Sequence, residues 1–290
     1  MKTNQKSRMK ATVLAALLTL SLSAGTALAG RGSSFGAVQQ AVDSNSPDAI
    51  MAEVERAEKL TCGGCGVIMT TLIDHPDYRV REVAAWWIAK RPGMRAKIRN
   101  QMFERLVSAN GVYARNAADV LGAFMNPEAV APITAALGRS DLQPMARVAA
   151  VNALAFIGHK VALPTLAAMT KDADAQVRRA AVAAIRELRE VTVSTDARAA
   201  ITDADAGVRL EAVQTVGFFK DTAGRVALEG ALKDADARVR ENAAWALGEL
   251  GDRAAFAALA AARDGDASVV VRDIAAAAIR NLKYAASLRG

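Results

Sequence analysis

The stretch that decides the fold is residues 234–252, which read DADARVRENAAWALGELGD. Apolar residues stand one place before Arg240 and three, six and seven places after it. They are Val239, Ala243, Ala246 and Leu247. These offsets fall on one face of a helix with about 3.6 residues per turn. The stretch therefore predicts an amphipathic helix that begins after an acidic turn.

The same pattern recurs along the chain at intervals of 31 to 33 residues, and an arginine marks the copies. The marking residues are Arg81, Arg147, Arg178, Arg209, Arg240 and Arg272. A further copy between the first two has Ala114 at the arginine position. Such a period is typical of arrays in which each copy is one helical hairpin. We therefore expect an all-α, right-handed α-solenoid of about seven stacked hairpins over residues 66–290, preceded by an N-terminal segment and helical cap over residues 30–65.

Within each copy, polar and small residues mark the ends of the first helix. Four aspartates stand before first helices as candidate N-caps, namely Asp174, Asp205, Asp236 and Asp266. Four glycines follow first helices and predict helix stops, namely Gly122, Gly158, Gly217 and Gly248. The repeated arginines are assigned a structural role, because a residue that recurs once per hairpin normally serves the stacking. Each can face the aspartate of the next copy or the carbonyls of a helix end.

The consensus D-A-D-A-x-V-R-x-x-A-A-x-A-L-G-x-L-G-D, nearly complete from Asp234 to Asp252, resembles HEAT repeats. It is most similar to short bacterial HEAT-like repeats of the phycobilisome-lyase type. The resemblance extends over most of the chain and implies one curved face made by the second helices. It does not imply one particular activity, since such arrays serve many unrelated functions.

The N-terminus has the order of a secretory signal peptide. Basic residues in the first ten positions precede an apolar run from Ala11 to Leu22, and then the small-residue segment Ala27-Leu28-Ala29. This order predicts a signal peptide over residues 1–29 with cleavage before Gly30. The apolar run is shorter than the roughly 20 residues of a membrane-spanning helix. We therefore expect an exported protein, in the periplasm, with no membrane span in the mature chain.

The charge of the mature chain argues against a nucleic-acid partner. The full sequence carries a formal net charge of +7, but four of its 37 basic residues lie in the first ten positions. Without them the net charge is +3, which is ordinary for a soluble protein of this size.

The two cysteines, Cys62 and Cys65, form the one chemically distinctive motif, Cys-Gly-Gly-Cys. Gly66 stands where haem attachment needs a histidine, and two cysteines with two histidines make a poor zinc set. In an exported protein this spacing favours a local disulfide at the start of a helix. Redox exchange remains the alternative, because a helix N-terminus can lower the pKa of a thiol.

No cofactor, metal ion or catalytic residue is predicted. His75 and His159 fall in turns on opposite edges of the expected stack, too far apart to share a metal. Deoxyhypusine hydroxylases, one enzyme branch that the repeats resemble, bind iron through His-Glu pairs, and this sequence has no such dipeptide. We find no serine-histidine-acid set and no phosphate-binding glycine loop.

Trp86 and Trp245 are the candidate binding residues. Both stand five places after a repeat arginine, where other copies have Asn152 or Gln214, so we expect this position to touch solvent. Trp87, one place later, falls on the core-facing stripe. We therefore expect a non-enzymatic scaffold that binds a protein or peptide partner. The alternatives are a redox-active dithiol protein and, suggested by the resemblance alone, chromophore handling like that of a bilin lyase.

Export makes a direct prediction about processing. N-terminal sequencing of the protein recovered from an exporting bacterial host should begin at Gly30, because cleavage follows the Ala27-Leu28-Ala29 segment. An intact Met1 in the soluble fraction outside the cytoplasm would contradict this expectation.

Overall fold

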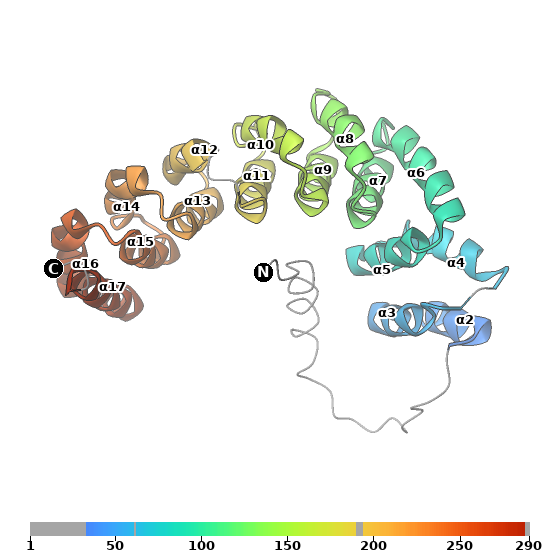
Figure 1. Ribbon diagram of the computed structural model, residues 1–290, viewed down its shortest axis with the longest axis horizontal. Helices are drawn as coiled ribbons and strands as arrows, with labels where there is room; N and C mark the ends of the chain where they lie inside the picture. The colour runs from blue at the N-terminus through green and yellow to red at the C-terminus, as the bar shows by residue number, and fades with distance from the viewer. Residues whose placement is uncertain (1–32, 61, 190–193, 288–290) are drawn as a thin grey trace, which may run out of the picture.

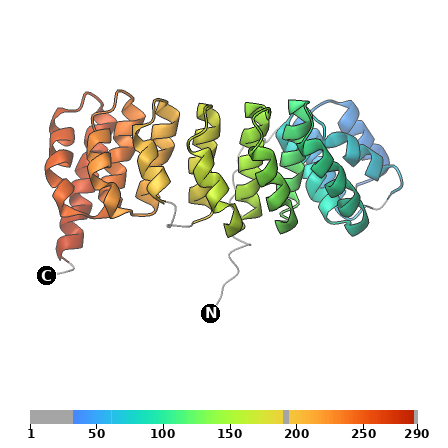
Figure 2. The ribbon, with the colours of Figure 1, turned by 90° about the horizontal axis from the view of Figure 1, so that it is seen from above.

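The computed structural model describes residues 33–60, 62–189 and 194–287. The predicted signal peptide lies outside these residues. Every regular element in the described ranges is a helix, and the helices stack side by side into an arch (Figures 1 and 2). The prediction of an all-α solenoid of stacked hairpins is confirmed.

The helices form two rows along the arch (Figure 1). The inner row comprises α3 (Pro47–Arg56), α5 (Tyr78–Ala89), α7 (Gly111–Ala123), α9 (Pro144–Ile157), α11 (Ala175–Glu187), α13 (Ala206–Phe218), α15 (Ala237–Leu250) and α17 (Val269–Ser287). The outer row comprises α4 (Cys65–Leu72), α6 (Pro92–Leu106), α8 (Val130–Leu137), α10 (Leu163–Met169), α12 (Ser194–Ala199), α14 (Arg225–Ala231) and α16 (Phe256–Gly265). Short 3-10 turns adjoin five outer helices, as η1 (Pro127–Ala129), η2 (Lys160–Ala162), η4 (Ala200–Thr202), η5 (Thr222–Gly224) and η6 (Arg253–Ala255). Helix α2 (Phe35–Asp43) packs on α3 at the N-terminal end.

The first helix of each copy lies in the inner row, and the second helix lies in the outer row. The second helices therefore make the convex face of the arch, and the first helices, which carry the repeat arginines, make the concave face (Figure 1). Side chains on the solvent-facing stripe of the first helices thus line the concave surface. This placement decides where a partner would meet the tryptophans.

Three repeat arginines, Arg178, Arg209 and Arg240, each join two neighbouring hairpins in the same way. Nη1 of Arg209 donates to the main-chain oxygens of Asp203 and Ala204, at 2.9 Å each, in the turn before its own helix. Nε of Arg209 donates to Oδ2 of Asp234 in the next hairpin at 2.6 Å. Two further pairs repeat these contacts at 2.8 Å: Arg178 with Asp203, and Arg240 with Asp266. One planar guanidinium thus satisfies a turn and a carboxylate together.

The other three repeat arginines, Arg81, Arg147 and Arg272, make different contacts. Arg147 contacts the Asp172 carboxylate, and Nη1 of Arg272 donates to the main-chain oxygen of Asp266 at 2.6 Å. Arg81 has Leu106 at the position where later copies have aspartate, so Asp119 of α7 replaces it, with Nε–Oδ2 at 2.9 Å. Burial raises the pKa of Asp119 although Arg81 favours its charged form.

Three of the four predicted aspartate caps lie at helix starts. Asp174, Asp205 and Asp236 each accept a backbone N–H from the first turn of the following helix. Asp266 differs from the prediction. It accepts from the backbone N–H of Ser268 and binds Arg240, which are the roles that Asp234 has in the preceding turn. Asp266 lies six residues before Arg272, as Asp234 lies six residues before Arg240, and so it is two residues before the cap position that Asp236 holds.

The predicted helix stops are correct at Gly158 and wrong at the other three glycines. Gly158 ends α9 with a φ of 70°, in the left-handed region that favours glycine. Gly122, Gly217 and Gly248 lie inside α7, α13 and α15 instead. A Cβ added at Gly217 would lie 2.7 Å from Cβ of Ala246 on the next inner helix. These glycines therefore allow close approach of adjacent inner helices.

The buried apolar residues form two clusters that meet at α11. One cluster runs from Val38 to Ile185, and the other runs from Val182 to Leu282. Alanines supply much of both cores, since the inner helices approach one another closely. Each hairpin therefore buries its apolar face against its neighbours, as expected for a linear array.

The arginine–aspartate links predict a pH dependence of stability. Hydrogen bonds from Arg209 lower the pKa of Asp234, so this carboxylate stabilises the fold above its unfolded pKa of about 3.9. The stabilisation is lost as the pH falls through the folded pKa. Asp234→Asn should lower the free energy of unfolding by about 1–2 kcal/mol at pH 7. Urea unfolding measured from pH 7 to pH 3 should show the two proteins converging at low pH; a constant difference would contradict the link.

Candidate functional site

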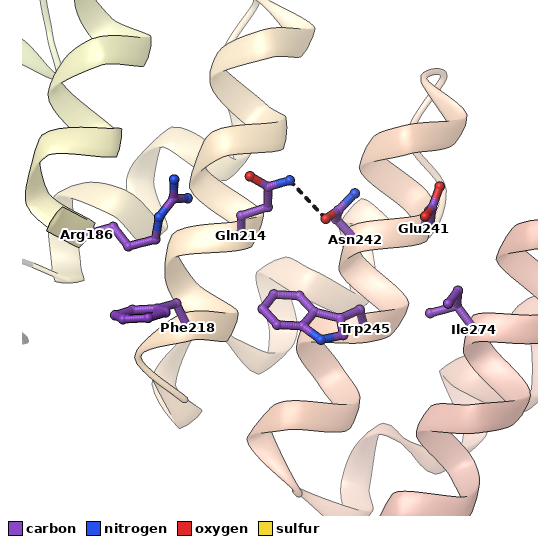
Figure 3. Close-up of a pocket in the computed structure, with 7 residues that line it drawn as sticks. All are labelled: Arg186, Gln214, Phe218, Glu241, Asn242, Trp245 and Ile274. Atoms are coloured by element: carbon purple, nitrogen blue, oxygen red, sulfur yellow. Dashed lines mark hydrogen bonds between the residues drawn. The ribbon is translucent and has the colours of Figure 1, made fainter. Parts of the chain in front are cut away.

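A shallow hollow lies on the concave surface where α11, α13, α15 and α17 run side by side (Figure 3). Its volume is about 420 Å³, and it is wide open to solvent. The lining residues are Arg186, Gln214, Phe218, Glu241, Asn242, Trp245 and Ile274. Because they come from four successive inner helices, the hollow exists only in the stacked array.

The lining residues form two parallel rows (Figure 3). The polar row follows the arch from Arg186 through Gln214 and Asn242 to Glu241, and the apolar row is Phe218, Trp245 and Ile274. Nε2 of Gln214 donates to Oδ1 of Asn242 at 3.1 Å, which ties α13 to α15. The hollow thus offers amide groups and apolar surface side by side.

Trp245 stands at the centre of the apolar row with 38% of its surface exposed. Its ring lies over Gly217 of the preceding inner helix, where an added Cβ would come within 2.7 Å of Trp245 Cζ3. A larger residue at position 217 would therefore displace the indole. The glycine positions the ring and leaves part of it open to solvent.

Some charged side chains around the hollow have ion-pair partners and others do not. Arg186 pairs with the largely buried Glu211 at 2.6 Å, and the Arg189 guanidinium lies 5.8 Å from the centre of the Phe218 ring. Glu241 has no ion-pair partner among the residues that the structure describes. One carboxylate of the polar row is therefore free to meet a ligand.

Trp86, the second predicted binding residue, lies far from the hollow, on α5 (Figure 1). It is half-buried, and the Lys90 ammonium lies 4.3 Å from the centre of its ring. The structure therefore does not bring Trp86 and Trp245 together. Sequence reasoning also missed Phe218, Gln214 and Asn242, since their proximity to Trp245 depends on the stacking of separate copies.

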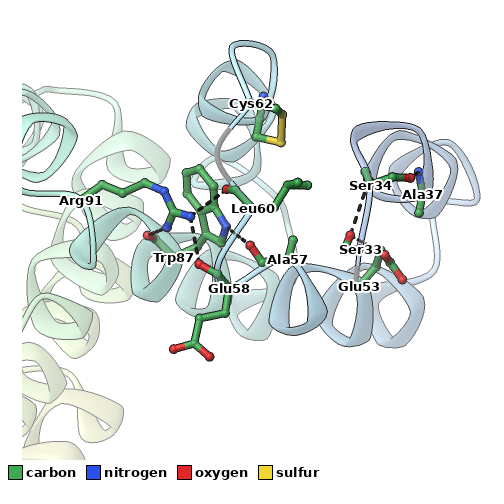
Figure 4. Close-up of a disulfide and its surroundings, with 11 residues drawn as sticks. Ser33, Ser34, Ala37, Glu53, Ala57, Glu58, Leu60, Cys62, Trp87 and Arg91 are labelled. Carbon is green, nitrogen blue, oxygen red and sulfur yellow. Dashed lines mark hydrogen bonds between the residues drawn. A yellow bond between two sulfur atoms is a disulfide. The ribbon is translucent and has the colours of Figure 1, made fainter. Parts of the chain in front are cut away.

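Trp87 is part of the N-terminal core (Figure 4). It is 2% exposed, and its Nε1 donates to the main-chain oxygen of Ala57 at 2.9 Å. The Arg91 guanidinium lies 3.1 Å from the centre of its ring and donates to the main-chain oxygens of Glu58 and Leu60 at 2.9 Å each. These contacts fasten the segment after α3 to α5.

Cys62 and Cys65 lie at the start of α4, in the outer row (Figures 1 and 4). Their sulfur atoms are within bonding distance, and Cys65 is fully buried. The pair is remote from the hollow, which α11 to α17 form at the other end of the arch. Oxidation of the pair in the cell stays a prediction.

Two observations bear on metals and membranes. In the described ranges, no group of three or more histidine, cysteine, aspartate or glutamate side chains could hold a metal ion. His75 and His159 instead accept backbone N–H bonds through Nδ1, from Asp77 and Val161. None of the described helices combines the length and apolar character needed to cross a membrane.

The repeats identify the protein's class. The family model for HEAT repeats matches residues 99–186 and 195–280, which together are more than half of the chain. The chain therefore belongs to the HEAT-repeat family. No curated protein matches it.

Solved structures are similar in fold. YibA of Escherichia coli shares 16% sequence identity, with 98% of each chain covered and a TM-score of 0.56. An engineered protein shares 18% identity over 82% of this chain and 71% of its own, with a TM-score of 0.51. A designed armadillo repeat protein in complex with the peptide (KR)4 has 20% identity, covers 63% of this chain and 98% of its own, and has a TM-score of 0.47. The identities are low enough that the first two likenesses concern the fold alone, and the third carries no argument.

The two environments of tryptophan predict opposite effects on stability. Trp87→Ala should lower the free energy of unfolding by about 3–5 kcal/mol, since it removes a large buried ring. Trp245→Ala should cost less, about 1–2 kcal/mol, because 38% of its surface is exposed and only the covered part loses packing contacts. Thermal and urea unfolding of the two variants will measure both. Equal destabilisation would show that Trp245 is a core residue.

The cysteine pair makes a separate prediction. Replacement of both Cys62 and Cys65 by serine should lower the melting temperature by a few degrees, because so short a loop restricts the unfolded chain little. A structural disulfide should have a reduction potential below about −300 mV. A potential near those of thiol-exchange enzymes would favour the redox alternative.

Proposed function

We propose that the protein is an exported, non-enzymatic scaffold that binds a protein or peptide partner on its concave face. The observation that supports this most directly is the hollow around Trp245. It combines a partly exposed indole, a neighbouring phenylalanine and two amide side chains on the adjacent helices α13 and α15. Solenoids present such extended concave surfaces to their partners.

Rigid stacking makes this surface suitable for binding. The inner helices are held by buried alanine and glycine contacts and by arginine–aspartate links, so binding orders few side chains of the scaffold. Preorganisation of this kind improves affinity because less conformational entropy is lost on association. Tryptophan is among the residues that most often dominate binding energy at interfaces.

The finer assignments are also proposals. Export to the periplasm rests on the signal-peptide pattern, and the phycobilisome-lyase type of repeat rests on the consensus sequence. A redox role for Cys62 and Cys65 would act at the N-terminal end of the arch, away from the hollow. Peptide binding and thiol chemistry can therefore be tested independently.

Selection from a displayed peptide library against the mature protein tests the binding surface. Peptides that bind the wild type should bind Trp245→Ala about 30-fold more weakly, which corresponds to loss of a hot spot of about 2 kcal/mol. Phe256→Ala is the matched control, since it truncates an exposed aromatic ring in the outer row. Selected peptides that are insensitive to Trp245→Ala but sensitive to Phe256→Ala would refute the concave site.

A further inference from the structure

We infer that the hollow recognises a basic peptide, with a lysine or arginine side chain lying on the Trp245 ring beside Glu241. This inference rests on the proposed peptide-binding function and adds the chemistry of the partner. Three observations support it. They are the exposed face of the Trp245 ring, the carboxylates of Glu241 and Asp273, which have no ion-pair partner in the described ranges, and the amide side chains of Gln214 and Asn242 in the polar row.

The other two tryptophans of the chain already bind cations. Lys90 lies 4.3 Å from the centre of the Trp86 ring, and Arg91 lies 3.1 Å from the centre of the Trp87 ring. Trp245 has no such cation among the described residues, although it is the most exposed of the three. A cation over an indole face is attracted by the electron density of the ring. Trp245 is therefore the tryptophan whose ring is available to a cation from outside.

The charges near Trp245 are of the sign that suits such a cation. Arg186 pairs with Glu211, which also lies 3.9 Å from Arg179, and Arg189 stands near Phe218, so the positive charge is confined to the Phe218 end of the hollow. Glu241 on α15 and Asp273 on α17 occupy the same repeat position, one place after a repeat arginine, and neither has an ion-pair partner in the described ranges. The C-terminal end of the hollow thus keeps uncompensated negative charge, which favours a basic over an acidic ligand.

The amide side chains of Gln214 and Asn242 in the polar row favour a peptide over a small cation, because they can hydrogen-bond a main chain. Gln214 and Asn242 lie beside the apolar row (Figure 3). Nδ2 of Asn242 donates to the main-chain oxygen of Arg238 at 2.7 Å, which fixes the orientation of this amide. Oε1 of Gln214 accepts no hydrogen bond from a described residue and can accept one from a peptide N–H. An extended main chain along this row would place alternate side chains toward Phe218 and Trp245.

Three synthetic peptides of one scaffold test the inference, Gly-Ser-X-Leu-X-Ser-Gly with both X positions arginine, serine or glutamate. Binding to the mature protein is followed by the indole N–H signals in ¹H–¹⁵N spectra, which the three tryptophans supply. The Trp245 signal is assigned by its loss in Trp245→Phe. The arginine peptide should shift this signal and bind at least about tenfold more tightly than the serine peptide, and the glutamate peptide should bind most weakly.

Glu241→Gln should weaken binding of the arginine peptide about tenfold and leave the serine peptide unchanged, while the melting temperature stays that of the wild type. Glu104→Gln is the matched control, because it removes one exposed carboxylate from α6 in the outer row without effect on binding. Free arginine amide, added alone, should shift the Trp245 signal much less than the peptide at equal concentration.

The outcomes separate this inference from the proposed function. Equal binding of the three peptides, or an unchanged affinity in Glu241→Gln, overturns the cationic ligand but keeps a peptide site if the Trp245 signal still shifts. An equal shift with free arginine amide overturns the role of the main chain. Binding of the arginine peptide without any change at Trp245 overturns the hollow as the site.

Discussion

The bond between a repeat arginine and the aspartate of the next hairpin determines how the units are arranged. In Arg209 the same guanidinium binds two carbonyls of its own turn and a carboxylate 25 positions later. The guanidinium is planar, so its Nε and Nη1 donors have fixed directions. The turn that Nη1 binds is therefore oriented relative to the turn of the next hairpin, which contains Asp234. The same bond recurs at Arg178 and Arg240, so three successive junctions in the C-terminal part of the arch are made in the same way.

The second constraint is the small size of the residues between inner helices. Alanine and glycine at these positions bring α13 and α15 so close that a single methyl group at Gly217 would collide with Ala246 and with the Trp245 ring. Large side chains must therefore project onto the concave surface, outside the contact. The close packing that stabilises the array also places the indole where a ligand can reach it.

The period of the sequence was sufficient to predict the solenoid and the helix that carries each arginine, because both depend on local periodicity. The burial of Trp87 and the exposure of Trp245 agree with their register. The role of Gly217 was assigned wrongly, because a glycine that allows close approach and a glycine that ends a helix look alike within one copy. The role of Asp266 was also assigned wrongly, because the turn before α17 differs in sequence from the turns of the other copies. The hollow itself could not be predicted, because Phe218 and Trp245 come from different copies, and their distance depends on the angle between units.

The meeting of two apolar cores at α11 has a consequence for cooperativity. Val182 belongs to the C-terminal core, whereas Ala181 and Ile185 on the same helix belong to the N-terminal core. The free energy that couples the two blocks is therefore carried largely by the one interface between α11 and α13. We expect the coupling across this interface to set how cooperatively the two blocks unfold. Because the hollow spans that interface, a ligand seated there would bind both blocks and make their unfolding more cooperative.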